Sequence, residues 1–207
     1  MKLTLKQIRP KPDQRLILVG ATGTGKTTLA RELLKPFKKI IVIDSKCTYG
    51  GKKGEEGYVM VNSPSALRNL RGSVDLIQYR PGERYQNPAD YDDVYKWCYR
   101  RQDIMVYTDE AFLVHHGSYA PDYLRACITC GRELGIGMIT GTQRPRGLDL
   151  RLLTEAEIFI SFELRHRDDR KRMAEMGGEE FMETPPKHSF WVWRAGDKKP
   201  TLARLKL

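Results

Sequence analysis

The stretch RLILVGATGTGKTTLARELLKPF, residues 15–37, decides the fold of this chain. An apolar run comes first, a turn of glycine and threonine follows, and a leucine-rich segment closes it, which is the order strand, turn, helix. Within it GATGTGKT, residues 20–27, matches the pattern G-x-x-x-x-G-K-[ST] completely. Because this pattern requires a strand before it and a helix after it, the stretch predicts a phosphate-binding loop rather than a flexible glycine turn.

The residue types of this loop suit a nucleoside triphosphate. Glycines let backbone N–H groups turn inward toward phosphate oxygens, and the positive end of the following helix adds a favourable field. In such loops the lysine, here Lys26, reaches the β- and γ-phosphates, and Thr27 offers its hydroxyl to Mg²⁺. We therefore expect ATP to bind the whole loop: Gly20, Ala21, Thr22, Gly23, Thr24, Gly25, Lys26, Thr27 and Thr28.

Further apolar runs alternate with helical stretches along the chain. The runs are mostly continuous, which indicates strands buried on both faces. After the phosphate loop they are KKIIVID (38–44), SVDLIQYR (73–80), DIMVYTDE (103–110), GIGMITGTQ (135–143) and EIFISFEL (157–164). We expect helices over 27–37, from Ser63-Pro64, over 88–101, over 121–134 and around 168–176. This alternation predicts an α/β fold with a mainly parallel, doubly wound sheet, closed by a C-terminal β-hairpin that turns near 195–198.

Length and composition limit what else the chain can contain. With 207 residues and 40% hydrophobic residues, one large domain is expected over 15–207, preceded by an N-terminal arm at 1–14. The segment GGKKGEEG, residues 50–57, is interpreted as a mobile loop from its composition. No run approaches the ~20 apolar residues that span a bilayer, and the first residues lack the apolar core of a signal peptide. We expect no membrane-spanning segment and a cytoplasmic location.

The chain is strongly basic, with a formal net charge of +10 and a pI near 9.5. Basic residues also solvate ordinary surfaces, but this excess favours a polyanionic partner, and nucleic acid is the first candidate. Lys52 and Lys53 are candidate DNA contacts, although the interpretation that they only lie on a solvated loop has at least as much support.

The cysteines and histidines give no metal site. Four scattered cysteines do not make a disulfide framework, which agrees with a reducing compartment. Cys127 and Cys130 have a metal-binding spacing, but no second pair completes a zinc site, so we interpret them as small buried thiols. His115 and His116 are neighbours that do not face one site on a helix, and we assign them to a polar loop.

A second motif ends the run at 103–110, where Asp109 and Glu110 follow four hydrophobic residues. The pattern resembles a Walker B strand. Adjacent acids alone are common on solvated loops, but together with the phosphate loop they indicate hydrolysis rather than mere binding. We expect Asp109 to hold Mg²⁺ beside Thr27, and Glu110 to polarise the water that attacks the γ-phosphate. The sequence has no N-K-x-D segment, which a GTPase would use to read guanine.

The run at 135–143 continues into TQRP, which puts Gln143 at a strand tip where it can touch the γ-phosphate. With this segment the chain resembles the FtsK–HerA superfamily of P-loop ATPases that pump DNA. The stretch VIDSK looks like the acid-and-lysine signature of that family, with Asp44 and Lys46 in the matching places and Ser45 where proline is common. FISFELRHRDDRKRMAEMGG resembles its closing strand and helix, so the resemblance covers roughly residues 15–180.

The resemblance implies a P-loop NTPase fold of the ASCE type and, because the chain is short, a compact genome-packaging ATPase of a double-stranded DNA virus. Such proteins form homo-oligomeric rings, here expected to be pentamers or hexamers, that thread double-stranded DNA into a preformed capsid through a portal vertex. The expected cofactors are ATP and Mg²⁺, and the location is the cytoplasm of the host. The alternatives are a cellular HerA- or FtsK-like translocase, an ATPase that acts on RNA or a small molecule, and an assembly switch that cycles with nucleotide.

The resemblance also implies an arginine supplied by a neighbouring subunit. None of the residues assigned so far neutralises the charge that develops between the β- and γ-phosphates. Arg132 is the first candidate, since related motors carry a trans-acting arginine in that region, and Arg144 in TQRP is the second. The catalytic set expected from the sequence is then Lys26, Glu110, Arg132 and Gln143. A plain alternative for Arg132 is a cation that favours the carboxyl end of its helix.

Overall fold

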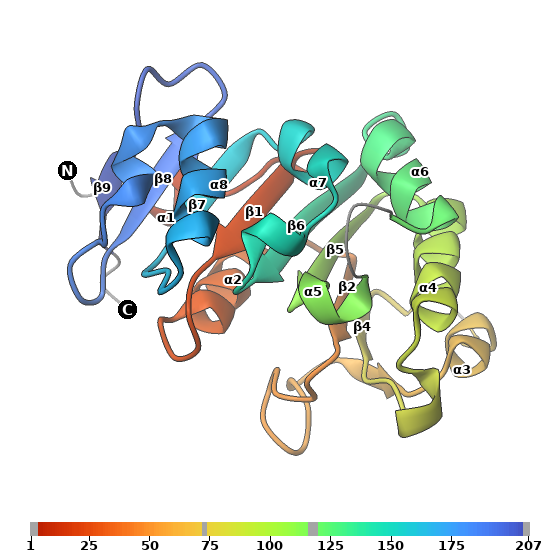
Figure 1. Ribbon diagram of the computed structural model, residues 1–207. Helices are drawn as coiled ribbons and strands as arrows, with labels where there is room; N and C mark the ends of the chain where they lie inside the picture. The colour runs from red at the N-terminus through yellow and green to blue at the C-terminus, as the bar shows by residue number, and fades with distance from the viewer. Residues whose placement is uncertain (1–3, 72–73, 116–119, 205–207) are drawn as a thin grey trace.

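The computed structural model describes residues 4–71, 74–115 and 120–204, and their strands form one nine-stranded sheet (Figure 1). The strand order is β3-β4-β2-β5-β6-β1-β7-β8-β9, with parallel pairing from β3 to β7 and antiparallel pairing from β7 to β9. The strands are β1 (Arg15–Val19), β2 (Ile40–Asp44), β3 (Val59–Val61), β4 (Leu76–Tyr79), β5 (Ile104–Asp109), β6 (Ile136–Thr142), β7 (Ile158–Ser161), β8 (Phe190–Arg194) and β9 (Thr201–Ala203).

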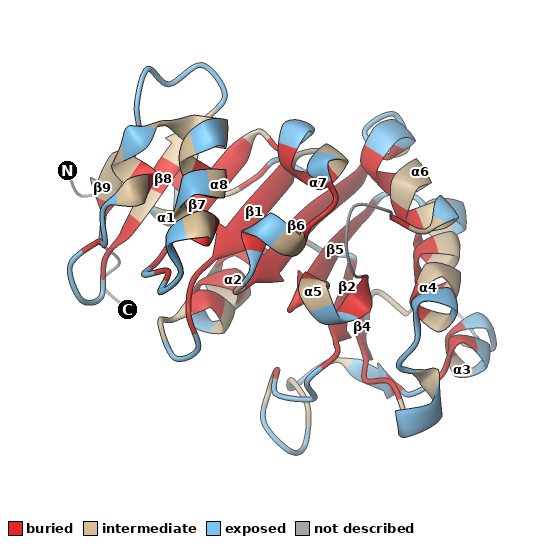
Figure 2. Ribbon diagram, viewed as in Figure 1, coloured by how far each residue is buried: buried red, intermediate tan, exposed pale blue. Residues whose placement is uncertain are grey.

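Helices cover both faces of the sheet. The face that carries Leu16 and Leu18 packs against α1 and α2, and the opposite face, with Ile17 and Val19, packs against the remaining helices. Every residue of β1, β2, β5, β6 and β7 is buried, as Figure 2 shows by the red strands between exposed helix surfaces. The helices are α1 (Leu5–Ile8), α2 (Lys26–Leu34), α3 (Pro64–Arg68), α4 (Pro88–Arg101), α5 (Ala111–Val114), α6 (Asp122–Cys130), α7 (Leu150–Thr154) and α8 (Arg167–Gly177).

Local capping explains where several helices begin. Ser63 accepts a hydrogen bond from the backbone N–H of Ala66, and Asn87 does the same for Asp90, with a proline next in each case. An oxygen-bearing cap followed by proline is a strong start signal, since it satisfies an end N–H group and fixes the first turn. The part of the chain that the structure describes also has three short 3₁₀ helices: η1 (Glu83–Tyr85), η2 (Pro145–Gly147) and η3 (Glu179–Met182).

The expected α/β architecture is confirmed. All the predicted parallel strands are present, and so is the C-terminal hairpin, whose strands β8 and β9 flank residues 195–198. The helix expected over 121–134 is shorter, because α6 ends at Cys130 and residues 131–135 form the turn into β6. The short elements α5, α7 and β3 were not predicted.

The N-terminal residues are tied to the sheet. Thr4 begins the single turn of α1, and Ile8 is buried against α2 and the β1 face. Ile8 and the partly buried Leu5 thus pack on the core, while Lys6 and Gln7 are exposed. The division into an arm and one domain stays a prediction. Among the described residues, no helix has the length and apolar character needed to cross a membrane.

Candidate nucleotide site

The phosphate loop links β1 to α2 at the carboxyl edge of the sheet. Gly25 precedes the helix with φ of 107°, and Gly23 has φ of 79°, values that side chains disfavour. At Gly20 a Cβ atom would lie 2.7 Å from the Cβ of Phe162, so only glycine fits beneath the loop. The glycines therefore serve the backbone shape that exposes N–H groups at the helix start, the arrangement that binds phosphate.

Lys26 is turned back onto its own loop. Its Nζ donates to the carbonyl oxygens of Gly20 at 2.7 Å and Ala21 at 3.1 Å, and the residue is buried. Burial lowers the pKa of the Lys26 ammonium, while attraction to Glu110 and Asp109 opposes that shift. The positive charge of Lys26 is thus held at the phosphate loop, close to Asp109 and Glu110.

Asp109 ends β5 with its carboxylate buried. The Tyr107 hydroxyl donates to its Oδ1 at 2.8 Å, and the same hydroxyl interacts with Thr27 at the start of α2. Burial raises the pKa of Asp109, and the Tyr107 hydrogen bond and the charge of Lys26 oppose that rise. The structure thus brings Thr27 and Asp109 onto one tyrosine hydroxyl, a link that sequence analysis missed.

Glu110 follows in the left-handed conformation, with φ of 60° and ψ of 63°. This backbone geometry costs roughly 1–2 kcal/mol for a residue with a Cβ. Its carboxylate accepts four hydrogen bonds: from Lys46 Nζ at 2.9 Å, Thr142 Oγ1 at 3.2 Å, Gln143 N at 2.9 Å and Gln143 Nε2 at 2.7 Å. Burial alone would raise the pKa of Glu110, but the bonds from Gln143 and Lys46 hold it below its usual value.

Gln143 connects this acid to the phosphate loop. Its side-chain oxygen accepts from the Thr22 hydroxyl at 2.9 Å, while its amide nitrogen donates to Glu110. A continuous chain of hydrogen bonds therefore runs from the loop to the acid. The order of strands makes it possible, since β6 lies between β1 and β5 and ends level with both.

The acid-and-lysine segment after β2 contributes two different contacts. Lys46 forms the ion pair with Glu110, whereas Asp44 is fully buried and faces away toward β4. Arg80 donates to Asp44 Oδ2 at 2.9 Å and to the carbonyl oxygens of Tyr49, Lys52 and Gly51. The residues expected to form a mobile loop are thereby held at their base, which composition did not predict.

The guanidinium groups of the two candidate arginines pair with acids other than Asp109 and Glu110. Arg132 sits in the turn after α6, at the amino edge of the sheet, and pairs with Glu157. Arg144 pairs with buried Asp169 on α8 at 3.2 Å. Neither placement tests a contact with a second subunit, so both roles remain predictions.

The expectations for the histidines and cysteines need two corrections. His115 is buried rather than part of a polar loop, and His116 lies outside the described residues. Cys127 is a buried thiol, with a pKa that burial raises to about 12, but Cys130 is exposed. The described residues hold no cluster of three metal-ligating side chains.

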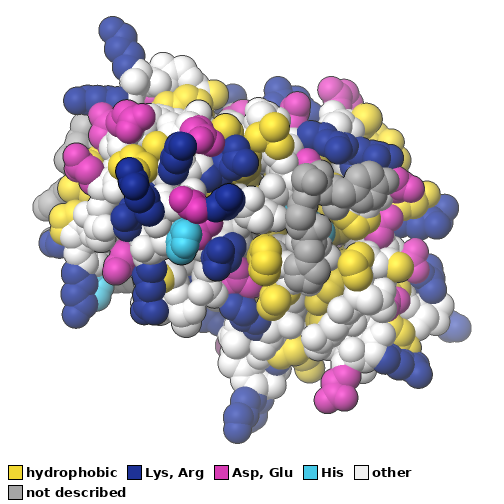
Figure 3. Space-filling model, in the orientation of Figure 1, with side chains coloured by type: hydrophobic (Ala, Val, Ile, Leu, Met, Phe, Trp, Pro, Cys, Tyr) yellow, Lys and Arg dark blue, Asp and Glu magenta, His cyan; other side chains and the backbone are white. Residues whose placement is uncertain are grey.

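Lys52 and Lys53 are exposed on the loop that Arg80 anchors. Exposure agrees equally with a DNA contact and with simple solvation, so the assignment stays a prediction. Figure 3 shows a second charged surface, over α8, where basic and acidic side chains interleave. Arg146, Lys171 and Arg172 face Asp168 and Glu175 there, so the positive charge is partly neutralised.

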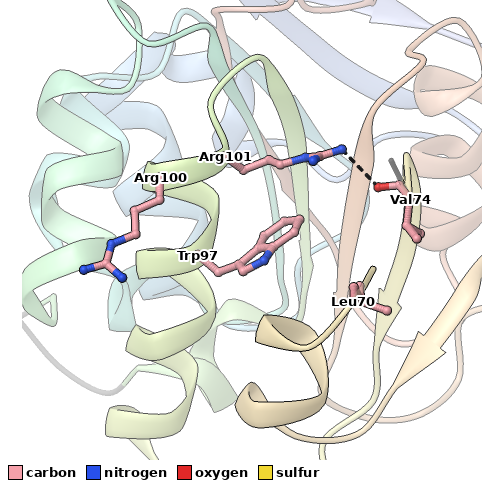
Figure 4. A pocket seen from close by; sticks show the side chains of 5 residues that line it. All are labelled: Leu70, Val74, Trp97, Arg100 and Arg101. Carbon is pink, nitrogen blue, oxygen red and sulfur yellow. Dashed lines mark hydrogen bonds between the residues drawn. The ribbon is translucent and has the colours of Figure 1, made fainter. Parts of the chain in front are cut away.

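A hollow of about 230 Å³ lies far from the nucleotide site, between α4 and the residues before β4 (Figure 4). Trp97 enters it, and the Arg101 guanidinium lies 5.7 Å from the ring and donates to the Val74 carbonyl oxygen. These contacts join α4 to the sheet edge. The hollow is explained by packing and is not part of the candidate site.

The donor set at Thr27 and Asp109 fits Mg²⁺. This ion binds through one or two protein oxygens and takes its other ligands from phosphates and water, so a three-residue cluster is not needed. Asp109 is buried and has its pKa raised by that burial, which a nearby cation would counteract.

The architecture is similar to that of solved genome-packaging proteins. The genome packaging NTPase B204 from Sulfolobus turreted icosahedral virus 2, in complex with ATPγS, superposes with a TM-score of 0.78 over 96% of this chain and 100% of that one, at 18% identity. B204, the DNA-packaging ATPase from Sulfolobus turreted icosahedral virus, gives 0.74 over 96% and 100%, also at 18% identity.

A more distant likeness is to the pCW3 conjugation coupling protein TcpA. Its TM-score is 0.56 at 14% identity, over 92% of this chain and 59% of that one. No protein-family model and no curated protein sequence matches the chain. The comparisons confirm the expected P-loop NTPase fold, of the kind found in genome-packaging ATPases.

Proposed function

We propose that this protein is an ATP-hydrolysing ring motor that translocates double-stranded DNA and packages a viral genome into a capsid. One observation supports hydrolysis most strongly: Glu110 is linked through Gln143 to Thr22 of the phosphate loop. A carboxylate held at the γ-phosphate end of such a loop is placed to accept a proton from water. A protein that only bound nucleotide would not need that acid.

Each side chain of the candidate site has a separate role in the proposed hydrolysis of ATP. Lys26 exchanges its carbonyl partners for phosphate oxygens and carries positive charge to them. Thr27 and Asp109 would hold Mg²⁺, which would neutralise phosphate charge when bound. Glu110 accepts a proton from the water whose oxygen bonds to the γ-phosphorus, and the bond between that phosphorus and the β,γ-bridging oxygen breaks so that ADP leaves. To reach the carboxylate, the water must displace one of its four donors. Gln143, bonded to both the loop and Glu110, responds to the γ-phosphate.

DNA as the substrate is supported by the net charge of +10 and by the packaging and conjugation functions named for the proteins with this fold. On this proposal the chain works as a homo-oligomeric ring, a pentamer or hexamer, at a capsid or portal vertex in the host cytoplasm. A motor must release every base pair that it passes, so its contacts are expected to be with phosphates rather than bases.

DNA-stimulated ATP hydrolysis tests this function. We expect duplex DNA to raise the hydrolysis rate regardless of sequence, and duplex binding to weaken steeply with salt because phosphate contacts release counterions. Competition among unrelated duplexes measures the first point, and a salt series the second. A strong preference for one sequence would indicate a regulator, stimulation by RNA alone an RNA-directed ATPase, and no stimulation by either an assembly switch.

A further inference from the structure

A pocket of about 380 Å³ lies at the amino edge of the sheet. It forms where β7 begins at Ile158 and β8 ends at Arg194, two residues that pair across the strands. Residues of α1 and of the turn before β1 also line it. The phosphate loop follows the other end of β1, roughly 16 Å away at about 3.3 Å per residue. The pocket is therefore separate from the nucleotide site.

Positive charge dominates the lining of this pocket. Of the described residues that line it, Glu157 is the one acid, and its carboxylate already accepts from the backbone N–H of Arg15 at 2.7 Å and pairs with Arg132. Among the described residues, none of the cations in the lining has an ion-pair partner. The pocket thus carries positive charge that the protein does not neutralise, which suits an anion. The cations are Lys6, Arg9, Lys11 and Arg194.

Hydrogen bonds hold the two arginines of the pocket in place. Arg194 donates to the Arg9 carbonyl oxygen at 3.1 Å, and Arg9 donates to the Glu32 carbonyl oxygen on α2 at 3.4 Å. The N–H of Ala195 donates to the Glu157 carbonyl oxygen at 2.8 Å, which fixes the end of β8 beside the start of β7. Segments far apart in the sequence are thus fastened together before any ligand arrives.

The same two guanidinium groups keep most of their donors available. A guanidinium has five N–H donors, and each of these two is bonded to one carbonyl oxygen. The Nε atoms of Arg9 and Arg194 are buried and have no acceptor within the described part of the chain. A buried donor without an acceptor is unfavourable, and an anion bound against the guanidinium would satisfy it.

The mixture of donors favours phosphate groups. The planar fork of arginine matches two oxygens of one phosphate, and lysine adds a mobile point charge. Duplex DNA carries one negative charge per ~1.7 Å of its axis, so neighbouring phosphates can engage several cations of one pocket at once. A single carboxylate cannot do so.

We propose that this pocket binds backbone phosphates of duplex DNA. The inference rests on the proposed DNA translocation and names a place where the DNA is held. It is distinct from Lys52 and Lys53, which follow β2 at the carboxyl edge of the sheet. Because phosphates carry no base identity, such a contact fits a motor that acts on any sequence.

Salt-dependent DNA binding tests the proposal. Lys6→Gln and Lys11→Gln change exposed side chains, so the fold is retained. By fluorescence anisotropy with a labelled duplex of mixed sequence, we expect each variant to reduce the slope of log Kd against log salt concentration by about 0.9, the loss of one phosphate contact. Lys171→Gln, exposed on α8 outside the pocket, removes the same charge and should keep the parent slope. ATP hydrolysis without DNA should equal that of the parent in all three variants.

The outcomes separate this inference from the proposed function. If the parent protein binds no duplex, both proposals are wrong. If it binds duplex, but Lys6→Gln and Lys11→Gln keep the parent slope, only the assignment of the pocket is wrong. An equal fall in slope for Lys171→Gln would also overturn it, because the lost charge would then act regardless of its position.

Lysine acetylation gives an independent readout that needs no variant. By mass spectrometry we expect duplex DNA to protect Lys6 and Lys11 from acetylation and to leave Lys171 reactive. Inorganic tripolyphosphate and poly-glutamate, at an equal concentration of charge, should protect the two lysines less. Equal protection by tripolyphosphate would indicate a site for free phosphate, and equal protection by poly-glutamate a site for an acidic protein. Either result, or no protection by duplex, would contradict the assignment to DNA.

Discussion

At the scale of single residues, Glu110 concentrates most of the chemistry of the candidate site. It combines a buried carboxylate, a left-handed backbone and four hydrogen bonds. An unpartnered buried carboxylate would take up a proton, but these donors hold its pKa below the usual value. The residue therefore stays charged and able to accept a proton at neutral pH.

Lys26→Ala and Glu110→Gln are expected to fail in different ways. The lysine variant should lose both ATP binding and hydrolysis, because it lacks the positive charge that Lys26 is expected to bring to the phosphates. The glutamine variant should bind ATP but hydrolyse it at least ~10²-fold more slowly, the scale of a lost general base. Binding and single-turnover assays distinguish the two. If Glu110→Gln hydrolysed ATP at the parent rate, Glu110 would not be the general base.

The Lys46 ion pair makes stability depend on pH. The lowered pKa of Glu110 means that its contribution is present above the ordinary value of 4.5 and is lost as the pH falls through the folded-state value. Lys46 is partly exposed, so Lys46→Ala should cost about 1 kcal/mol at pH 7. Urea unfolding at pH 7 and pH 4 measures this difference, which should shrink at the lower pH. Lys52→Ala, exposed and outside this pair, is the control, and a pH-independent loss for Lys46→Ala would contradict the assignment.

At the scale of elements, the loop between β2 and β3 is held by contacts that depend on the order of the strands in the sheet. Arg80 lies beside the end of β4, and Asp44 ends β2, which is the neighbouring strand. Their buried ion pair and the carbonyl bonds of Arg80 fix residues 49–52. The glycines of this loop therefore adopt defined turns, and Gly50 has no room for a Cβ atom because Glu55 N would lie 2.2 Å away.

Arg80→Met is expected to loosen this loop. Removing one partner of a buried ion pair costs about 3 kcal/mol, and it also frees three backbone carbonyl oxygens here. Hydrogen exchange should rise at residues 47–54 while β5 remains protected. Arg84→Met, on the exposed η1 turn, is the matched control. Unchanged exchange over 47–54 would show that the arginine does not order the loop.

Local sequence predicted the elements that are buried on both faces, and missed those that depend on neighbours. The strands β1, β2, β5, β6 and β7 are continuous apolar runs, so their pattern is unambiguous. The edge strand β3 exposes Val59 and Met60 and has only three residues, which gives no such pattern.

The same limit applies to the candidate site. The phosphate loop and the paired acids are local motifs, and their arrangement at one edge followed from parallel strands. The link from Tyr107 to Thr27 and the pairing of Arg80 with Asp44 depend on which strands are neighbours. Alternation of strands and helices does not specify that order, so these contacts could not be predicted.

At the scale of the whole molecule, the sheet separates two edges that carry candidate site residues. The phosphate loop, Glu110 and Gln143 lie at its carboxyl edge, whereas Arg132 precedes β6 at the amino edge. The seven residues of β6 separate those edges by roughly 20 Å, at about 3.3 Å per residue. Arg132 therefore cannot reach its own Glu110, and any catalytic contact must cross a subunit boundary. A head-to-tail ring provides such a contact, since it joins different surfaces of neighbouring subunits.

Subunit mixing tests that contact. Arginines supplied in trans contribute about 10³–10⁵ in rate, so Arg132→Ala and Glu110→Gln should each be nearly inactive as homomers. Mixed rings should regain activity wherever an intact Arg132 faces an intact Glu110. Glu157→Gln breaks the ion pair within the subunit but keeps the arginine, so it should stay active if Arg132 acts across the boundary. If mixed rings form but remain inactive, or if Arg132→Ala alone keeps full turnover, Arg132 is not the trans-acting residue and Arg144 is the next one to test.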